Sequence, residues 1–168
     1  TESFTVTLSS PTFSSIADGV AIGTITENDT APSFAIDDVS VSESAGIATF
    51  TVTKTGATTV DATVQFATAD GTASSAASVD FTAHAATTLT FAPGVATLTL
   101  TVSIANDAIA EGNETYSVTL SSAVASTISD NSGLGTITND DTPTISGVSP
   151  TSGPDSGGTT ITITGTSK

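Results

Sequence analysis

A segment of 28 residues that occurs twice is the feature that most constrains the fold of this chain. Residues 2–29 align without a gap to residues 114–141, and 14 of the 28 aligned positions are identical. The offset of 112 residues is the size of a whole β-sandwich domain and exceeds the repeat of a solenoid. The sequence therefore predicts that the chain opens with the last two strands of one domain and continues into a complete second copy.

Alternation of apolar residues with Thr and Ser predicts that the complete copy is all-β. Residues 47–53 and 95–104 place apolar side chains on one face and hydroxyl side chains on the other, which is the period of a half-buried strand. The alternation changes phase at Asp37 and Asp38, as a β-bulge or a switch between two sheets would produce. We expect strands at residues 34–41, 47–53, 60–68, 87–91, 95–104, 116–122 and 134–138, with Val60 facing inward and a turn at residues 54–56. Seven strands without a helical period indicate an antiparallel Greek-key, immunoglobulin-like β-sandwich.

The repeat also predicts the domain boundaries. Residues 1–31 are expected to be the C-terminal strands of a preceding repeat, residues 32–142 a complete sandwich, and residues 143–168 the opening strands of a different β domain. An isolated hairpin is only marginally stable in water. We therefore expect the first segment to lean on the next domain, on another chain, or on a further part of a longer protein.

Composition excludes several kinds of partner. The 168 residues include 17 Asp and Glu but only two Lys and Arg, which gives a formal net charge of −15. Such a surface repels nucleic-acid phosphates and anionic lipids, and no apolar run approaches the roughly 20 residues that span a bilayer. There is no Cys, and Thr, Ser, Ala and Val are abundant. This composition is typical of a secreted all-β protein, so we expect an extracellular or cell-surface location.

An acidic loop between two predicted strands is the strongest functional signal. Asp107, Glu111 and Glu114 lie within eight residues, between the strands at 95–104 and 116–122. Carboxylates held this close repel one another unless a cation joins them, and Ca²⁺ accepts roughly 6–8 oxygen ligands. The sequence therefore favours one wall of a calcium site here, with a solvated acidic loop as the alternative.

Six sequence pieces closely resemble the Calx-beta motif, a sandwich known from sodium–calcium exchangers and from long bacterial surface proteins. They are residues 41–46 (VSESAG), 69–73 (ADGTA), 78–81 (SVDF), 89–94 (LTFAPG), 111–116 (EGNETY) and 137–141 (ITNDD). Residues 143–168 are similar to the start of an IPT/TIG domain, through residues 148–150 (VSP), 152–154 (SGP) and 157–159 (GGT).

The Calx-beta resemblance implies a set of calcium ligands. The matching positions are Glu43, Asp80, Asp107, Glu111, Glu114, Asp140 and Asp141, with the carbonyl oxygen of Ile109 as a further ligand. The exchanger members carry Asp where this chain has Asn106, Ala108 and Asn139. Fewer anionic groups imply that fewer ions bind and that they bind more weakly. We expect a calcium dissociation constant of about 10⁻⁴–10⁻³ M, which is common in extracellular modules.

These features lead to a structural rather than a catalytic expectation. The sequence carries no nucleophile, metal-protease or phosphate-loop motif, so we expect no enzymatic activity. We expect a calcium-binding repeat of a large bacterial adhesin, stalk or filament, in which calcium rigidifies domain junctions. Its expected partners are neighbouring domains or copies of itself, joined head to tail by strand complementation, and an unidentified surface ligand. The alternatives are a non-catalytic spacer of a secreted enzyme and a cadherin-like adhesion repeat.

Overall fold

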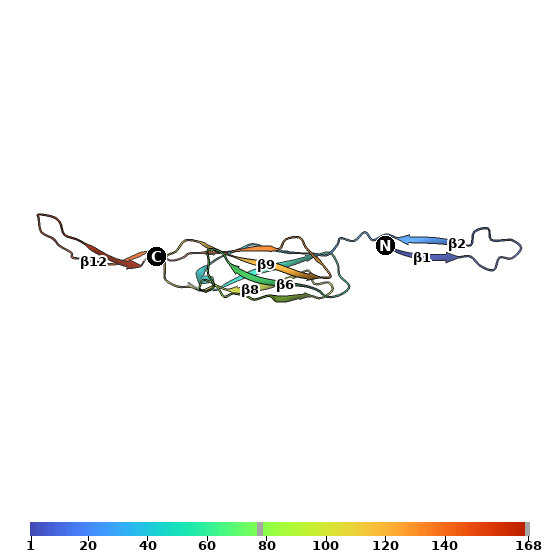
Figure 1. Cartoon of the computed structure of the whole chain (residues 1–168), viewed down its shortest axis with the longest axis horizontal. Coiled ribbons are helices and arrows are strands. Elements are labelled where there is room, and N and C mark those ends of the chain that lie inside the picture. Colours follow the sequence, from blue (N-terminus) through green and yellow to red (C-terminus); the bar gives the residue numbers. More distant parts are fainter. Residues whose placement is uncertain (77–78, 167–168) are drawn as a thin grey trace. The chain divides into compact units, whose positions relative to one another are not determined.

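The computed structural model describes residues 1–76 and 79–166, and these residues are almost entirely β-structure (Figure 1). The chain divides into two compact units, Thr1–Thr30 and Ala31–Lys168. Within the described residues, no helix has the length and apolar character needed to cross a membrane.

Two sheets form a sandwich in the second unit. The four-stranded sheet has the order β10 (Thr127–Ile128), β3 (Ser33–Ile36), β5 (Ile47–Thr55) and β8 (Thr97–Ser103). The five-stranded sheet has the order β4 (Val39–Ser42), β11 (Ser132–Thr138), β9 (Glu114–Val124), β6 (Ala62–Asp70) and β7 (Thr87–Phe91). A single turn of 3-10 helix, η1 (Glu43–Ala45), joins β4 to β5. The predicted all-β sandwich is confirmed, although two edge pairs, β10 with β3 and β4 with β11, are parallel.

The phase change at the aspartate pair is a switch between sheets. β3 belongs to the four-stranded sheet and β4 to the five-stranded sheet, and Asp37 and Asp38 lie between them. The Asp37 carboxylate accepts a hydrogen bond from the Thr51 amide, and Asp38 accepts one from the Leu134 amide, both at 2.7 Å. Each aspartate is therefore bonded to a different sheet, which fixes the crossing point.

Aromatic side chains fill the space between the two sheets. The Tyr116 ring stacks on Phe81 with ring centroids 4.5 Å apart and meets Phe50 edge-on at 6.1 Å. Tyr116 is buried, and this burial raises the pKa of its hydroxyl to about 12. A side chain at Gly135 would collide with the same ring, because an added Cβ would lie 2.3 Å from Tyr116 Cζ. The apolar face of β9 is thus held between the sheets by aromatic packing.

Three local predictions are wrong, each because a strand begins or ends elsewhere. Val60 is exposed because β6 begins only at Ala62. Lys54 is buried within β5, because β5 continues to Thr55 and so includes the first two residues of the expected turn. Ala96 precedes β8 and is exposed, and the short edge strand β10 gave no signal in the sequence.

A two-stranded hairpin lies at each end of the chain. β1 (Glu2–Thr7) pairs with β2 (Val20–Ile25), and β12 (Thr144–Ser149) pairs with β13 (Thr162–Thr166), both in antiparallel fashion. The assignment of these hairpins to a preceding Calx-beta repeat and to an IPT/TIG domain stays a prediction.

Candidate metal centre

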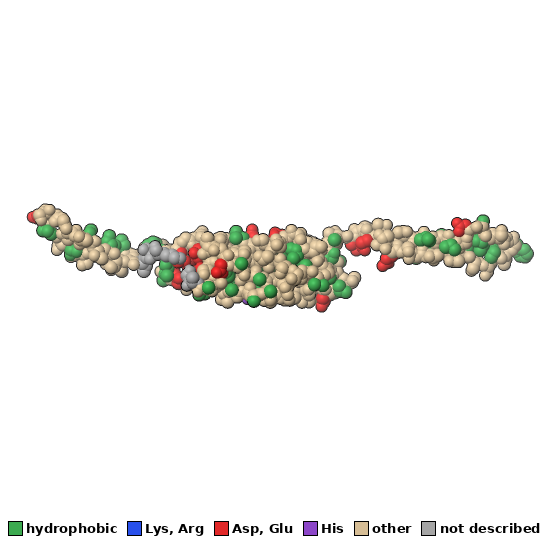
Figure 2. Space-filling model, in the orientation of Figure 1, with side chains coloured by type: hydrophobic (Ala, Val, Ile, Leu, Met, Phe, Trp, Pro, Cys, Tyr) green, Lys and Arg blue, Asp and Glu red, His purple; other side chains and the backbone are tan. Residues whose placement is uncertain are grey.

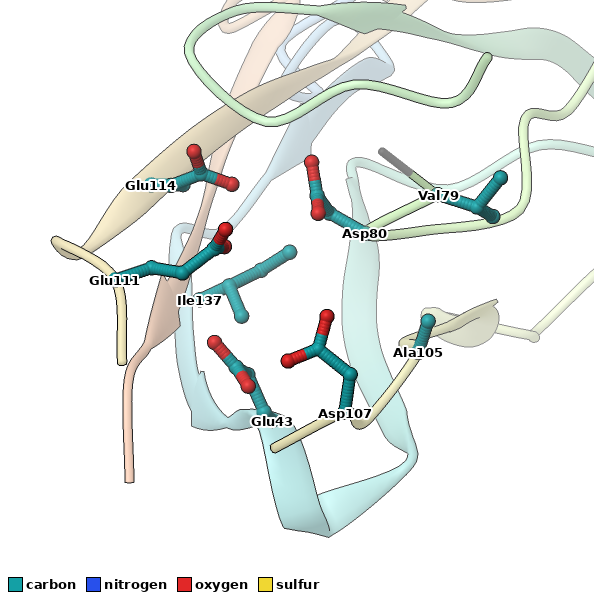
Figure 3. Close-up of a pocket in the computed structure, with 8 residues that line it drawn as sticks. All are labelled: Glu43, Val79, Asp80, Ala105, Asp107, Glu111, Glu114 and Ile137. Atoms are coloured by element: carbon teal, nitrogen blue, oxygen red, sulfur yellow. The ribbon is translucent and has the colours of Figure 1, made fainter. Parts of the chain in front are cut away.

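Carboxylates from four separate segments gather at one end of the sandwich (Figures 2 and 3). The first segment is η1, and the second is the stretch just before Phe81. The third is the loop from β8 to the start of β9, and the fourth follows β11. Strand pairing brings these segments together, although they are distant in sequence: parallel pairing of β4 with β11 places Ser42 beside Thr138, and antiparallel pairing of β11 with β9 places Ile137 beside Glu114. The acidic side chains that the segments contribute are Glu43, Asp80, Asp107, Glu111, Glu114, Asp140 and Asp141.

The first group of carboxylates consists of Glu43, Asp107 and Asp141. One oxygen atom from each lies within 4.8 Å of the others. Glu43 is only 7% exposed, although its side chain is acidic. The Oδ2 atom of Asp141 is buried and has no hydrogen-bond partner. An unpartnered buried carboxylate oxygen is costly, and a cation at this position would offset that cost.

The second group consists of Asp80, Glu111 and Glu114, again with one oxygen from each within 4.8 Å of the others. Backbone pairing fixes Asp80, because its amide donates to Ser74 O and its carbonyl accepts from Ala105 N, both at 2.9 Å. Its Oδ2 atom also accepts a hydrogen bond from the Ser74 amide at 2.7 Å. Within this second group, Asp80 is therefore held by bonds to two separate backbone segments, at Ser74 and at Ala105.

Five of the six carboxylates in the two groups line one small pocket, and Asp141 is the one that does not. Figure 3 shows Glu43 and Asp107 on one side of it and Glu111 and Glu114 on another, with their carboxylates turned inward. The pocket has a volume of about 10 Å³, which is room for about one water-sized sphere. Calcium–oxygen bonds of 2.3–2.6 Å allow ligand atoms to lie up to about 5 Å apart, and the oxygen atoms of each group lie within 4.8 Å of one another. The donor set, all oxygen and anionic, suits a hard divalent cation.

The electrostatics of the site also favour a cation. Burial, and then the negative charges of Asp107, Asp140, Asp141 and Glu111 in that order, raise the pKa of Glu43. The carboxylate oxygens of each group lie within 4.8 Å of one another, so like charges at this end of the sandwich repel. Among the described residues Lys54 is the only Lys or Arg, and it lies near the far end of β5. No basic side chain of the described chain neutralises this site.

Asn139 connects the acidic loop to the residues after β11, a role that sequence reasoning missed. Its side-chain oxygen accepts a hydrogen bond from the Glu111 amide at 3.0 Å, and its side-chain nitrogen donates to the Asp141 carbonyl at 2.7 Å. The Asn139 amide in turn donates to the Asn113 side chain at 3.3 Å. A carboxylate at this position would lose the donor to Asp141. The asparagine therefore trades a charge for a link between the two segments.

Six of the eight predicted ligands are brought together in the two groups, and two lie beside them. The Asp140 carboxylate accepts a hydrogen bond from Ser42 Oγ at 2.6 Å, and bonds from Ser42 and then Ser44 lower its pKa. The Ile109 amide donates to Asp107 Oδ1 at 2.7 Å, which turns the loop at this point. Whether Asp140 and the Ile109 carbonyl bind an ion stays a prediction.

Comparison with known proteins places the sandwich within a family. The Calx-beta domain family matches residues 27–141. The crystal structure of the apo-form Calx CBD1 domain shares 24% identity at a TM-score of 0.61, and the match covers 67% of this chain and all of that one. The structure of CBD12 from CALX1.2 shares 25% identity at a TM-score of 0.59, over 64% of this chain and 45% of the other. The calcium-binding domain CBD12 of CALX1.1 shares 22% identity at a TM-score of 0.60, over 68% of this chain and 50% of the other.

The chain spans about half the length of the two CBD12 structures. No curated protein matches its sequence.

Proposed function

Because the chain belongs to the Calx-beta family, whose match covers residues 27–141, we propose that it binds Ca²⁺ at the acidic end of its sandwich. The observation that carries this proposal is the pair of adjacent carboxylate groups, one of which contains the buried, unpartnered Oδ2 atom of Asp141. In these two groups Glu43, Asp107 and Asp141 hold one side of the ion site, and Asp80, Glu111 and Glu114 hold the other.

Calcium would stabilise the domain by cross-linking segments that are otherwise held apart by their charges. Its ligands come from η1, from the segment before Phe81, from the β8–β9 loop and from the residues after β11. A bound divalent cation turns the repulsion within each carboxylate group into attraction to a common centre. Asp141 is the last of these ligands along the chain, so the ion would also fix the point at which the chain leaves the sandwich.

We further propose a structural role for this site, in a repeat of a large extracellular bacterial adhesin, stalk or filament. Calcium at the chain exit would stiffen the junction with the next domain. The net charge of −15 and the absence of Cys suit a secreted repeat that needs no disulfides, and millimolar extracellular calcium would keep a site of about 10⁻⁴ M affinity filled. The role is non-catalytic, and it would serve equally well in a spacer next to an enzyme domain.

Thermal unfolding of the whole chain in EGTA, in 10 mM Ca²⁺ and in 10 mM Mg²⁺ tests the calcium site. A ligand at 100 times its dissociation constant stabilises the folded state by about 2.7 kcal/mol, which is roughly 10 °C in Tm for a domain of this size. We expect this rise with Ca²⁺ and little of it with Mg²⁺, which requires shorter bonds in octahedral geometry.

Two asparagine substitutions give the matched control for this experiment. Asp141→Asn removes a ligand, whereas Asp61→Asn removes an exposed acid that lies outside both carboxylate groups. We expect the calcium-dependent rise to shrink strongly in Asp141→Asn and to persist in Asp61→Asn. An equal rise with Ca²⁺ and Mg²⁺, or an equal response of the two variants, would show that the acids only respond to ionic strength.

A further inference from the structure

The hairpin of β1 and β2 exposes an apolar face, although its alternating sequence pattern is typical of strands that bury one face. Phe4 is 53% exposed, Val6 49%, Leu8 61% and Ile25 57%. Strand alternation places Phe4, Val6 and Leu8 on one face, and Gly23 lies opposite Phe4. Figure 2 shows hydrophobic side chains on the surface of this unit. Exposed apolar surface of this kind marks a place where another element packs.

The hairpin has the same strand register as β9 and β11 of the complete sandwich. Glu2 pairs with Ile25 through to Thr7 with Val20, and Glu114 pairs with Ile137 through to Thr119 with Ser132. Adding 112 to each residue number of the first set gives the second set. The next hydrogen bond agrees as well, because Leu8 N donates to Gly19 O and Leu120 N donates to Asn131 O, both at 2.8 Å. The hairpin is therefore a second copy of the β9–β11 pair in structure as well as in sequence.

A contact between an aromatic ring and a glycine is also present in both copies. An added Cβ at Gly23 would lie 2.4 Å from Phe4 Cζ, as one at Gly135 would lie 2.3 Å from Tyr116 Cζ. In each pair the ring lies flat against the neighbouring strand at a position where only glycine leaves room. This contact sets the ring orientation that Tyr116 uses to stack on Phe81. Phe4 is thus already oriented for a partner like Phe81.

The complete sandwich shows what covers such a face. Tyr116, Val118, Leu120 and Ile137, the counterparts of the exposed residues, are all at most 3% exposed. They pack in a core with buried side chains from β3, β5, β6 and β8, among which are Phe34, Phe50, Phe66 and Val102. The β1–β2 hairpin has the same register, spacing and aromatic position, so we expect its apolar face to pack against strands like β3, β5, β6 and β8.

We propose that the β1–β2 hairpin docks on the front strands of another Calx-beta repeat, the counterparts of residues 33–112, joined to this polypeptide ahead of Thr1. A second copy of the chain offers the same strands, but its own β9 and β11 already cover them within one molecule. A strand set that leads directly into Thr1 has no such competitor, and its cost of loop closure is small. The docked unit would be a complete sandwich.

The docked unit would also complete a second calcium site, and this part rests on the function proposed above. Glu2 and Asp29 would take the positions of Glu114 and Asp141, while Glu27 and Asn28 would replace Asn139 and Asp140. The front strands would supply the counterparts of Glu43, Asp80, Asp107 and Glu111. Where the complete site has a carboxylate at Asp140, the second site would have one at Glu27, the counterpart of Asn139. The total charge of the two sites would therefore be the same.

The test is to graft residues 31–112 in front of the whole chain, so that the copied Gly112 precedes Thr1. This join preserves the spacing of the repeat, because Thr1 corresponds to Asn113. Hydrogen exchange over residues 1–30 is measured in EGTA, so that the result does not depend on calcium. We expect exchange to slow by roughly 100-fold or more relative to the ungrafted chain, because strands in a core open only with the domain.

Two variants of the grafted protein separate docking from a general effect of added sequence. Phe4→Asp places a charge on the face to be buried and should abolish the slowing, whereas Thr5→Asp lies on the opposite face of β1 and should keep it. No slowing in the graft would overturn the proposal. It would also be overturned if the ungrafted chain formed dimers, by sedimentation, in which exchange over residues 1–30 was already slow, because a second copy would then be the occupant.

Calcium titration of the grafted protein tests the second site separately. We expect the number of bound ions to double relative to the ungrafted chain. Slowed exchange without additional calcium would leave the docking proposal standing and overturn the second site alone. Calcium binding by neither protein would overturn the proposed function and leave the exchange result to decide the docking.

Discussion

Two charged side chains are buried in the sandwich, near opposite ends of strand β5, and their surroundings differ. Lys54, one residue before the end of β5, donates to the Gly56 carbonyl and the Thr58 hydroxyl, both at 3.3 Å. Glu43, four residues before β5 begins, is instead surrounded by further carboxylates, and its pKa is raised. Burial alone therefore does not mark a binding site. The Lys54 ammonium has oxygen acceptors, whereas the Glu43 carboxylate faces like charges that a cation or a proton would offset.

The largest test of this contrast is Glu43→Gln, whose effect should change sign with calcium. In EGTA the substitution removes repulsion from the neighbouring carboxylates, so we expect a higher Tm than that of the wild type. In 10 mM Ca²⁺ it removes a ligand, so most of the stabilisation of about 2.7 kcal/mol should be lost. Urea unfolding under both conditions gives the two free energies.

Lys54→Met is the companion variant and should not respond to calcium. It leaves the Gly56 carbonyl and the Thr58 hydroxyl without their donor, so we expect a loss of about 1–2 kcal/mol. The loss should be equal in EGTA and in Ca²⁺, because Lys54 lies near the other end of β5. A loss of stability that differed between EGTA and Ca²⁺ would show that Lys54 and the acidic end of the sandwich are coupled. The contrast between Lys54 and Glu43 would then no longer hold.

Asn139→Ala should have a smaller effect, because it removes links between ligand segments rather than a ligand. The side chain bonds the Glu111 amide and the Asp141 carbonyl, and each such bond contributes about 1 kcal/mol. We expect calcium to bind roughly fivefold more weakly, which calorimetric titration measures. Asn131→Ala, at an exposed side chain outside both carboxylate groups, is the control. Unchanged affinity in Asn139→Ala would show that the two segments need no link.

The repeat and the strand alternation were sufficient to predict the sandwich. Both depend on patterns that persist over many residues, such as the alternation in residues 47–53 that became β5. The errors lie where one or two residues decide the outcome. β5 continues through Lys54 because the backbone there pairs with Phe34 of β3 and donates to the Ala96 carbonyl, and nothing in the immediate sequence shows these partners. Long-range pairing likewise decides β10, a strand of two residues.

The acids of the candidate site could be named from sequence, but their arrangement could not. The resemblance supplied the positions of Glu43, Asp107 and Asp141, whereas only the fold shows that they form one group. Asn139 was interpreted as a missing charge because the exchanger members of the family carry Asp at this position. Its hydrogen bond from the Glu111 amide joins segments 28 residues apart, and no local pattern records such a contact.

The smallest expected effect is a pH dependence of the stability, which arises from Glu43 at the acidic end of the sandwich. Because the pKa of Glu43 is raised in the folded state, the folded chain binds a proton more tightly than the unfolded chain. In EGTA, stability should therefore rise as the pH falls through the raised pKa toward its ordinary value of 4.5. The pKa of Asp140 is lowered from 3.8, so its stabilising contribution is lost only at still lower pH and does not obscure this window.

Lys54→Met should keep this rise, whereas Glu43→Gln, which cannot be protonated in this range, should lose it. In Ca²⁺ the direction should reverse, because protons compete with the ion for the same oxygens. Unfolding free energies at pH 7 and pH 5 for the three proteins test this point. A rise of the same size in Glu43→Gln would assign the proton uptake to other acids. The contrast between Lys54 and Glu43 would then be supported only by their different responses to calcium.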